Sequence, residues 1–229
     1  MAKTKTIENL FNYLAFFSDL LPCLLFFIFL KKSTSIKPLW IVTIYCVYDF
    51  LTNIGLLYLD HKPSRVFLYS SFTFFEYAFF VWILFLFIKN AVFKKFIIGS
   101  SLFFTIFIIT YNLLVKVIGI DSIPIGVEAI LILIFSFYYL YEQMKDTETL
   151  FVYSRYSFWI VLGMMLYLAG SFFIYIYASQ LDPVQVGKYW IFTNIFSIIK
   201  NIFFAIAILL HISAKSKSEK INYKVYSLN

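Results

Sequence analysis

The chain has 229 residues, of which 62% are hydrophobic and only 14% are charged, and its mean hydropathy is +0.86. Soluble domains carry about a quarter charged residues, so this composition excludes an ordinary soluble protein and predicts an integral membrane protein. The net charge of +7 is accounted for by membrane topology, and we therefore expect no nucleic-acid partner.

Seven apolar runs are long enough for helices that cross a bilayer core, which takes about 20 residues. In chain order we expect helices over residues 10–30, 38–59, 66–88, 96–118, 123–141, 156–178 and 188–211. The connections between them are too short to fold alone, so residues 1–229 are predicted as a single all-α, polytopic seven-helix bundle in a lipid bilayer. Residues 212–229 are expected to form a short basic tail.

The lysine and arginine residues between the predicted helices are distributed unevenly over the two sides of the membrane. One side carries 12 of them: Lys31, Lys32, Lys37, Lys89, Lys94, Lys95, Lys145, Arg155, Lys215, Lys217, Lys220 and Lys224. The opposite side carries 6, and Lys200 inside the last helix completes the 19. Because Lys and Arg are retained in the cytoplasm during insertion, we expect the N-terminus outside and the tail in the cytoplasm. The first apolar run lacks a small-residue cleavage site, so it is predicted to be a retained helix.

Polar residues recur at helical spacing on one face of most predicted helices, which therefore prefer protein or water to lipid on that side. The sixth helix differs, because Gly163, Tyr167 and Gly170 share a face that lets a neighbouring helix approach closely. The polar faces together define a candidate ligand or ion pathway, made of Asp19, Asp49, Asn53, Glu76, Asn112, Glu128, Ser197, Lys200 and Asn201.

Lys200 lies in the middle of the last apolar run, where a charge costs about 2.5 to 3.5 kcal/mol to insert. Counted from the predicted outer helix ends, Asp19, Asp49, Glu76 and Lys200 fall within roughly 5 Å of one another in depth. We expect one of the three carboxylates to hold Lys200 and predict that Lys200 and Glu76 form one electrostatic unit. Such a cluster either fixes helix packing alone, or belongs to a ligand pocket or an ion pathway.

Signatures of catalysis and metal binding are missing from the sequence. It has no HExxH, Gly-rich phosphate loop or Cys-x-x-Cys pair, and no nucleophile and base at helical spacing, so we do not expect an enzyme. Cys23 and Cys46 are expected to be small apolar fillers inside helices. His61 and His211 are predicted at opposite membrane faces, so they cannot share a metal ion.

A lysine in the seventh helix facing a helix 3 carboxylate, with the N-terminus outside, resembles the layout of microbial rhodopsins, which would imply retinal on Lys200. Phe196 stands where those pumps usually carry an acidic residue, and the Arg and Thr-Thr-Pro signature of helix 3 is absent around Glu76. We therefore expect no covalent cofactor.

Four stretches carry a second resemblance: FTFFEYAFF around Glu76, YYLYEQMKDTETL at the end of helix 5, YSFWIVLGMMLYLAGSFF in helix 6 and KNIFFAIAILL in helix 7. With these the chain resembles a set of bacterial seven-helix membrane proteins for which no activity is known. The resemblance points to Glu76, Glu142, Trp159 and Gly163 as residues of interest. It also fits a multi-pass protein of a bacterial inner membrane.

Two functions remain open on this sequence. The first is a sensor or receptor-like protein that binds a small ligand in a polar intramembrane cavity and acts through a separate cytoplasmic or membrane partner. The partner would be contacted at the longest inner loop, through Glu142, Asp146, Glu148 and Arg155. The alternative is a permease for a small solute, coupled to an ion or a proton through Glu76 and Lys200.

Overall fold

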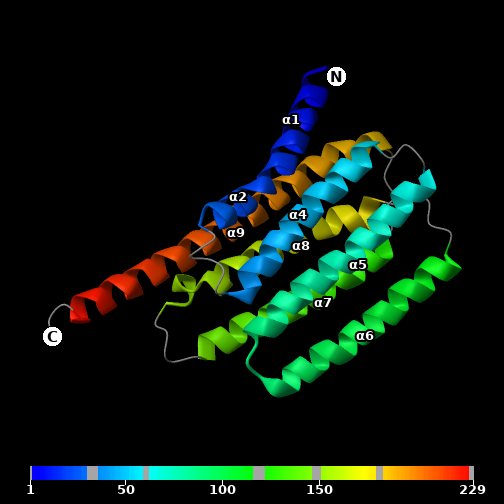
Figure 1. Ribbon diagram of the computed structural model, residues 1–229. Helices are drawn as coiled ribbons and strands as arrows, with labels where there is room; N and C mark the ends of the chain where they lie inside the picture. Colours follow the sequence, from blue (N-terminus) through cyan, green and yellow to red (C-terminus); the bar gives the residue numbers. More distant parts are fainter. Residues whose placement is uncertain are drawn as a thin grey trace.

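The computed structural model describes residues 2–29, 36–58, 62–115, 122–145, 151–178 and 183–226. Within these ranges the secondary structure consists of helices (Figure 1). They are α1 (Ala2–Ser18), α2 (Leu20–Ile28), α4 (Lys37–Tyr58), α5 (Lys62–Phe87), α6 (Ala91–Leu114), α7 (Ser122–Lys145), the 3-10 helix η1 (Val152–Ser154), α8 (Tyr156–Ala178) and α9 (Pro183–Tyr226).

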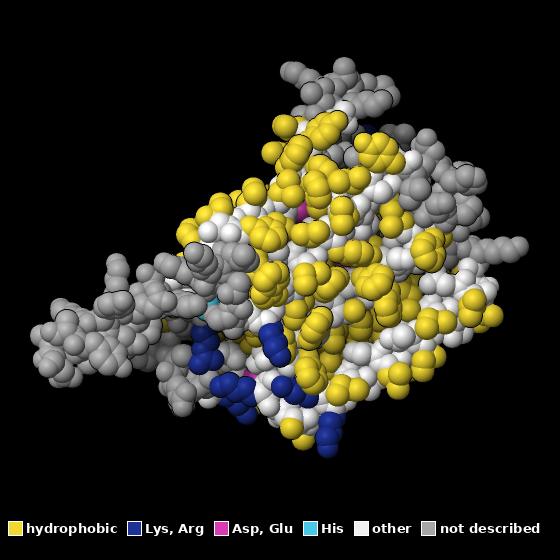
Figure 2. All heavy atoms as spheres, in the orientation of Figure 1, with side chains coloured by type: hydrophobic (Ala, Val, Ile, Leu, Met, Phe, Trp, Pro, Cys, Tyr) yellow, Lys and Arg dark blue, Asp and Glu magenta, His cyan; other side chains and the backbone are white. Residues whose placement is uncertain are grey.

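Seven segments of the described chain are long and apolar enough to cross a membrane, which confirms the expected all-helical architecture with seven candidate membrane spans. They are Asn9–Ile28, Lys37–Leu56, Val66–Phe87, Ala91–Leu114, Ser122–Lys145, Tyr156–Tyr177 and Lys188–Ala214. The side chains on the visible face of the bundle are mostly hydrophobic, as a lipid-facing surface requires, and basic side chains gather at one end (Figure 2).

The first predicted helix is in fact two helices that meet at Asp19. The physical reason is Pro22, which has no N–H to donate to the carbonyl of Ser18 and whose ring crowds that carbonyl. The Ser18 hydroxyl instead donates to the carbonyl of Ala15 at 2.7 Å. Asp19 keeps right-handed helical dihedral angles, with φ −61° and ψ −28°, although the helix assignment is interrupted there. Its side chain lies inside the bundle, where it is 1% exposed.

Other helix boundaries also differ from prediction by several residues, most clearly those of α6 and α9. Helix α6 begins at Ala91, five residues before the expected start, because Asn90 caps it. The Asn90 side-chain oxygen accepts hydrogen bonds from the backbone N–H groups of Val92 at 2.8 Å and Phe93 at 3.1 Å. The expected tail after residue 211 also continues as helix, since α9 runs without interruption to Tyr226.

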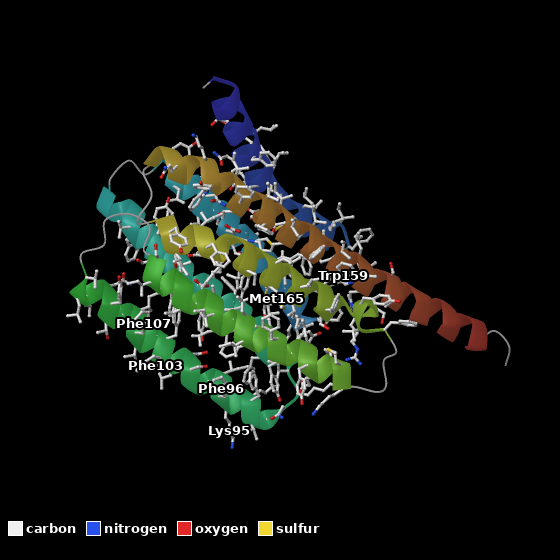
Figure 3. All side chains as sticks on the ribbon, turned by 180° about the vertical axis from the view of Figure 1, so that it is seen from behind. Lys95, Phe96, Phe103, Phe107, Trp159 and Met165 are labelled. Atoms are coloured by element: carbon white, nitrogen blue, oxygen red, sulfur yellow. The ribbon has the colours of Figure 1, made fainter. Side chains whose placement is uncertain are left out.

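Helices α8 and α9 pack closely over much of their length, as the glycines of the sixth predicted helix indicate. A Cβ atom at Gly163 would lie 3.2 Å from the backbone oxygen of Lys200, and a Cβ at Gly170 would lie 2.3 Å from the ring of Phe196. Helix α6 lies at the opposite edge of the bundle beside α5 and α7 (Figure 1), and Phe96 and Phe103 lie along it (Figure 3). On the other side of the bundle, helices α1, α2 and α8 contact α9.

Candidate functional site

Lys200 projects from α9 into the bundle and is completely buried. Its ammonium nitrogen, Nζ, donates to the hydroxyl of Tyr45 at 2.6 Å and forms an ion pair with Oδ2 of Asp49 at 3.0 Å. The rings of Tyr45 and Tyr167 have their centroids 4.6 and 4.4 Å from Nζ, within the range of cation–π attraction. The charge is therefore held by one carboxylate, one hydroxyl and two aromatic rings.

Glu76 joins this group through Tyr45, so Lys200 and Glu76 belong to one cluster as predicted, while the ion pair of Lys200 is made with Asp49. The Tyr45 hydroxyl donates to Oε1 of Glu76 at 2.6 Å while it accepts a hydrogen bond from Lys200. Tyr45 lies one helical turn before Asp49 on α4, so both side chains face the same neighbours. Of the three carboxylates considered for Lys200, the direct partner is thus Asp49.

Asp19 enters the same network from the break between α1 and α2. Its Oδ1 accepts a hydrogen bond from Nδ2 of Asn201 at 2.7 Å, and its Oδ2 accepts one from Nδ2 of Asn53 at 3.4 Å. The Asn53 amide also reaches Oδ1 of Asp49 at 3.2 Å. A continuous chain of polar contacts therefore runs from Asp19 through Asn53, Asp49, Lys200 and Tyr45 to Glu76; we call these six residues the buried network.

A cavity of about 500 Å³ adjoins the buried network on the side nearer the start of α9. Six helices contribute to its wall, namely α1, α4, α5, α7, α8 and α9, and it extends toward the end of the bundle at which α5, α7 and α9 begin. Its lining consists of Asn12, Tyr13, Ala15, Phe16, Phe17, Asp19, Asp49, Thr52, Asn53, Leu56, Tyr69, Phe72, Thr73, Glu76, Ile125, Glu128, Tyr167, Leu168, Tyr175, Trp190, Thr193, Asn194 and Ser197. A cavity of this size suits a small organic molecule.

Two buried polar groups in the cavity wall have no hydrogen-bond partner within the described part of the protein. Oε1 of Glu128 on α7 is one, in a residue that is 1% exposed, and Oγ1 of Thr193 on α9 is the other, in a residue that is 5% exposed. A buried polar atom without a partner costs about 1 to 3 kcal/mol, more if it is charged. A ligand that forms hydrogen bonds with these two atoms would remove this cost.

The remaining predicted pathway residues fall into three groups. Ser197 lines the cavity, while Asn201 lies beneath it and links Asp19 to the Ser18 hydroxyl at 2.8 Å. Asn112 does not line the cavity, because it is exposed on α6, where it accepts a hydrogen bond from the Ser70 hydroxyl at 3.1 Å. Periodicity placed Asn112 on a polar face, but that face of α6 meets α5 outside the cavity.

The predicted partner loop is partly used for internal contacts. Glu142 lies within α7, and its carboxylate accepts the backbone N–H groups of Lys89 and Asn90, both at 2.8 Å, so it fastens the connection between α5 and α6. Arg155 donates to Oε1 of Gln143. Asp146 and Glu148 lie outside the described residues.

Several residues of the site were missed by sequence reasoning. Tyr45 and Tyr167 surround Lys200, and Tyr175 and Trp190 form an edge-to-face pair in the cavity wall with centroids 5.8 Å apart. The spacing of four places Tyr45 on the polar face of its helix together with Asp49, although Tyr45 was not included in the predicted pathway. The abundance of aromatic residues in the chain concealed the others.

The described residues include no cluster of His, Cys, Asp and Glu side chains that could hold a metal ion. Cys23 and Cys46 are both buried free thiols, and the Cys23 thiol donates weakly to the carbonyl of Thr43 at 3.7 Å. Their burial agrees with their expected role as fillers.

The fold and the site define a multi-pass helical membrane protein with a cavity above a buried network of ionisable groups. Comparisons with protein-family models, curated proteins and solved structures found no significant match to this chain. The function must therefore be inferred from the geometry of the site.

Proposed function

We propose that this protein is a sensor or receptor-like protein, which binds a small ligand in the cavity and signals through a separate cytoplasmic or membrane partner. The observation that carries the proposal is the position of the cavity directly on the buried network. Asp19, Asp49, Asn53 and Glu76 belong to both, so a ligand that contacts them competes with the contacts that hold α4, α5 and α9 together. Ligand binding would thereby shift the packing of these helices.

Helix α9 offers a route from the cavity to a partner. Thr193, Asn194 and Ser197 line the cavity, Lys200 lies in the network one turn further, and the same helix continues past the membrane span, which ends at Ala214, to Tyr226. We propose that a partner contacts this extension, on the side to which the predicted loop of residues 142–155 also belongs.

We place the N-terminus outside and the extension in the cytoplasm of a bacterial cell, with the bundle in the inner membrane. The supporting observation is that Lys37, Lys89, Lys94, Lys95 and Arg155 all lie at one end of the described helices, whereas Lys188 lies near the other end. With this orientation the cavity occupies the outer half of the bundle, and the ligand enters from outside.

A thiol-labelling experiment tests ligand access. In a background in which Cys23 and Cys46 are replaced by Ala, Ser197→Cys should react with a membrane-impermeant thiol reagent added outside intact cells. Ser136→Cys is the matched control, since Ser136 is fully buried on α7 and does not line the cavity. Equal labelling of the two variants, or protection of Ser197→Cys, would contradict an outward-accessible cavity.

The alternative is a permease coupled to an ion or a proton. It is favoured by the position of Tyr45, whose hydroxyl connects Lys200 and Glu76 and could pass a proton between them. The two functions differ in liposomes that contain the purified protein. Solute uptake that Lys200→Met or Glu76→Gln abolishes would establish transport. A ligand-dependent signal from a fluorophore at Ser216→Cys, without uptake, would establish sensing.

A further inference from the structure

We propose that the cavity accepts a small organic ammonium ion, with its cationic group against Glu128 and its apolar body among the aromatic side chains of the wall. This inference rests on the proposed ligand-binding function and specifies the chemical class of the ligand.

The first support is the charge of the cavity wall. Among the residues whose side chains the structure describes, four carboxyl groups line it, those of Asp19, Asp49, Glu76 and Glu128, and no Lys or Arg does. The buried ammonium of Lys200 lies beneath the wall and is committed to Asp49. Carboxylates at this depth need protons or cations to neutralise them, so the cavity favours a cationic ligand over an anionic one.

The second support distinguishes Glu128 from the other three carboxyl groups. Asp19 accepts hydrogen bonds from two asparagines, Asp49 pairs with Lys200, and Glu76 accepts from Tyr45. Oε1 of Glu128 has no such partner in the described structure, and neither has Oγ1 of Thr193. An ammonium group supplies several N–H donors and a positive charge, which is what these acceptors need.

The third support is the aromatic character of the same wall. Tyr175 and Trp190 form their edge-to-face pair there, and Phe16, Phe72 and Tyr167 add further ring surface. Aromatic faces attract organic cations and also cover apolar ligand surface. An inorganic cation fits less well, because it would prefer a cluster of oxygen ligands and the described residues provide no such metal-binding group.

The probes for the test are 2-phenylethylamine, 2-phenylethanol and 3-phenylpropionate. Each has one phenyl ring on a short chain, and at neutral pH they are positive, neutral and negative. Binding to the full-length protein in nanodiscs of zwitterionic lipid is measured by titration calorimetry, with empty nanodiscs as the blank. We expect the amine to bind at least about tenfold more tightly than either analogue.

Glu128→Gln should weaken binding of the amine by about tenfold or more and leave binding of the alcohol unchanged. Thr193→Val should weaken binding of the amine and of the alcohol, but less than Glu128→Gln weakens binding of the amine. Glu142→Gln is the matched control, because it removes a carboxylate from the same helix at the far end from the cavity and should leave all three affinities unchanged.

No detectable binding of the amine, equal affinity for amine and alcohol, or an unchanged affinity of Glu128→Gln would each overturn the ammonium proposal. Tight binding of the alcohol or the acid that Ser197→Trp abolishes would leave the cavity as a ligand site for another class of molecule. The thiol-labelling experiment separates these results from a failure of the proposed function, since it reports access to the cavity whatever the ligand is.

Discussion

At the scale of single residues, the environment of Lys200 explains how a fully buried ammonium is tolerated. Ion pairs inside a protein gain little net stability, because desolvation of both charges offsets their attraction. Lys200 offsets that cost further with the hydrogen bond to Tyr45 and the two aromatic rings. Removal of either Lys200 or Asp49, in contrast, leaves the other charge buried without its ion-pair partner.

We predict strong coupling between Lys200 and Asp49. Lys200→Met and Asp49→Asn should each lower the free energy of unfolding by roughly 1 to 4 kcal/mol, and the double variant should lose clearly less than the sum. The same cycle with Glu76→Gln should give a smaller coupling, because Glu76 meets Lys200 only through Tyr45. Equilibrium unfolding in mixed micelles measures all three. Strictly additive losses for Lys200 and Asp49 would contradict the observed ion pair.

A second prediction concerns Tyr45. Tyr45→Phe keeps the ring that packs against Phe80, with centroids 4.8 Å apart, but removes the hydroxyl between Lys200 and Glu76. We expect a loss of about 1 to 3 kcal/mol, because two buried charged groups each lose a hydrogen bond. The coupling between Lys200 and Glu76 should fall toward zero in this background. Tyr48→Phe, on the same helix and only half-buried, serves as the control and should cost less.

The sequence predicted the depth of the ionisable residues in the site but not their pairing. The common depth of Asp19, Asp49, Glu76 and Lys200 followed from helix ends and the helical rise, and the structure does bring them together. Which carboxylate meets Lys200 depends on helix rotation and neighbour order, which periodicity in one helix does not contain. For the same reason Asn112 was included and Tyr167 was left out.

At the scale of the elements, proline and glycine determine where a helix breaks and how closely two helices pack. The length of an apolar run contains neither piece of information. Pro22 divides the first membrane span at Asp19, and Gly163 and Gly170 set the distance between α8 and α9. Length and composition predicted where the spans lie, but they could not predict the break. The boundaries of α6 and α9 were misjudged because lysines were taken to end the helices, whereas the helical backbone includes them.

The packing of α8 on α9 leads to a prediction for Gly170→Ala. The added Cβ would lie 2.3 Å from the Phe196 ring, so the ring or the helix must shift, and we expect a loss of about 1 to 3 kcal/mol. Gly99→Ala on α6 is the matched control, since its Cβ would have nothing within 4 Å. It should be neutral or slightly stabilising, because Ala favours helix over Gly. If Phe196→Leu fails to rescue Gly170→Ala, the contact is not the cause.

At the scale of the whole molecule, the side of the membrane on which the cavity opens depends on the orientation of the chain. Because 12 Lys and Arg residues lie on one predicted side and 6 on the other, we expect a reporter that is active only in the cytoplasm to work when fused after Asn229. The same reporter inserted at His61 should be inactive. The reverse pair of results would place the cavity in the cytoplasmic half of the bundle and the ligand on the other side of the membrane.

Because α9 is an uninterrupted helix, a tilt of it would move its two ends by different distances. Lys200 is pinned to α4, and it lies about 15 Å along the helix axis from Trp190 in the cavity wall but about 39 Å from Tyr226 at the far end. If α9 tilts as a rigid rod about this pin by about 5°, Trp190 moves by roughly 1.3 Å and Tyr226 by roughly 3.4 Å. Such a tilt would therefore turn a displacement smaller than a bond length at the cavity into one more than twice as large at the opposite end of the helix.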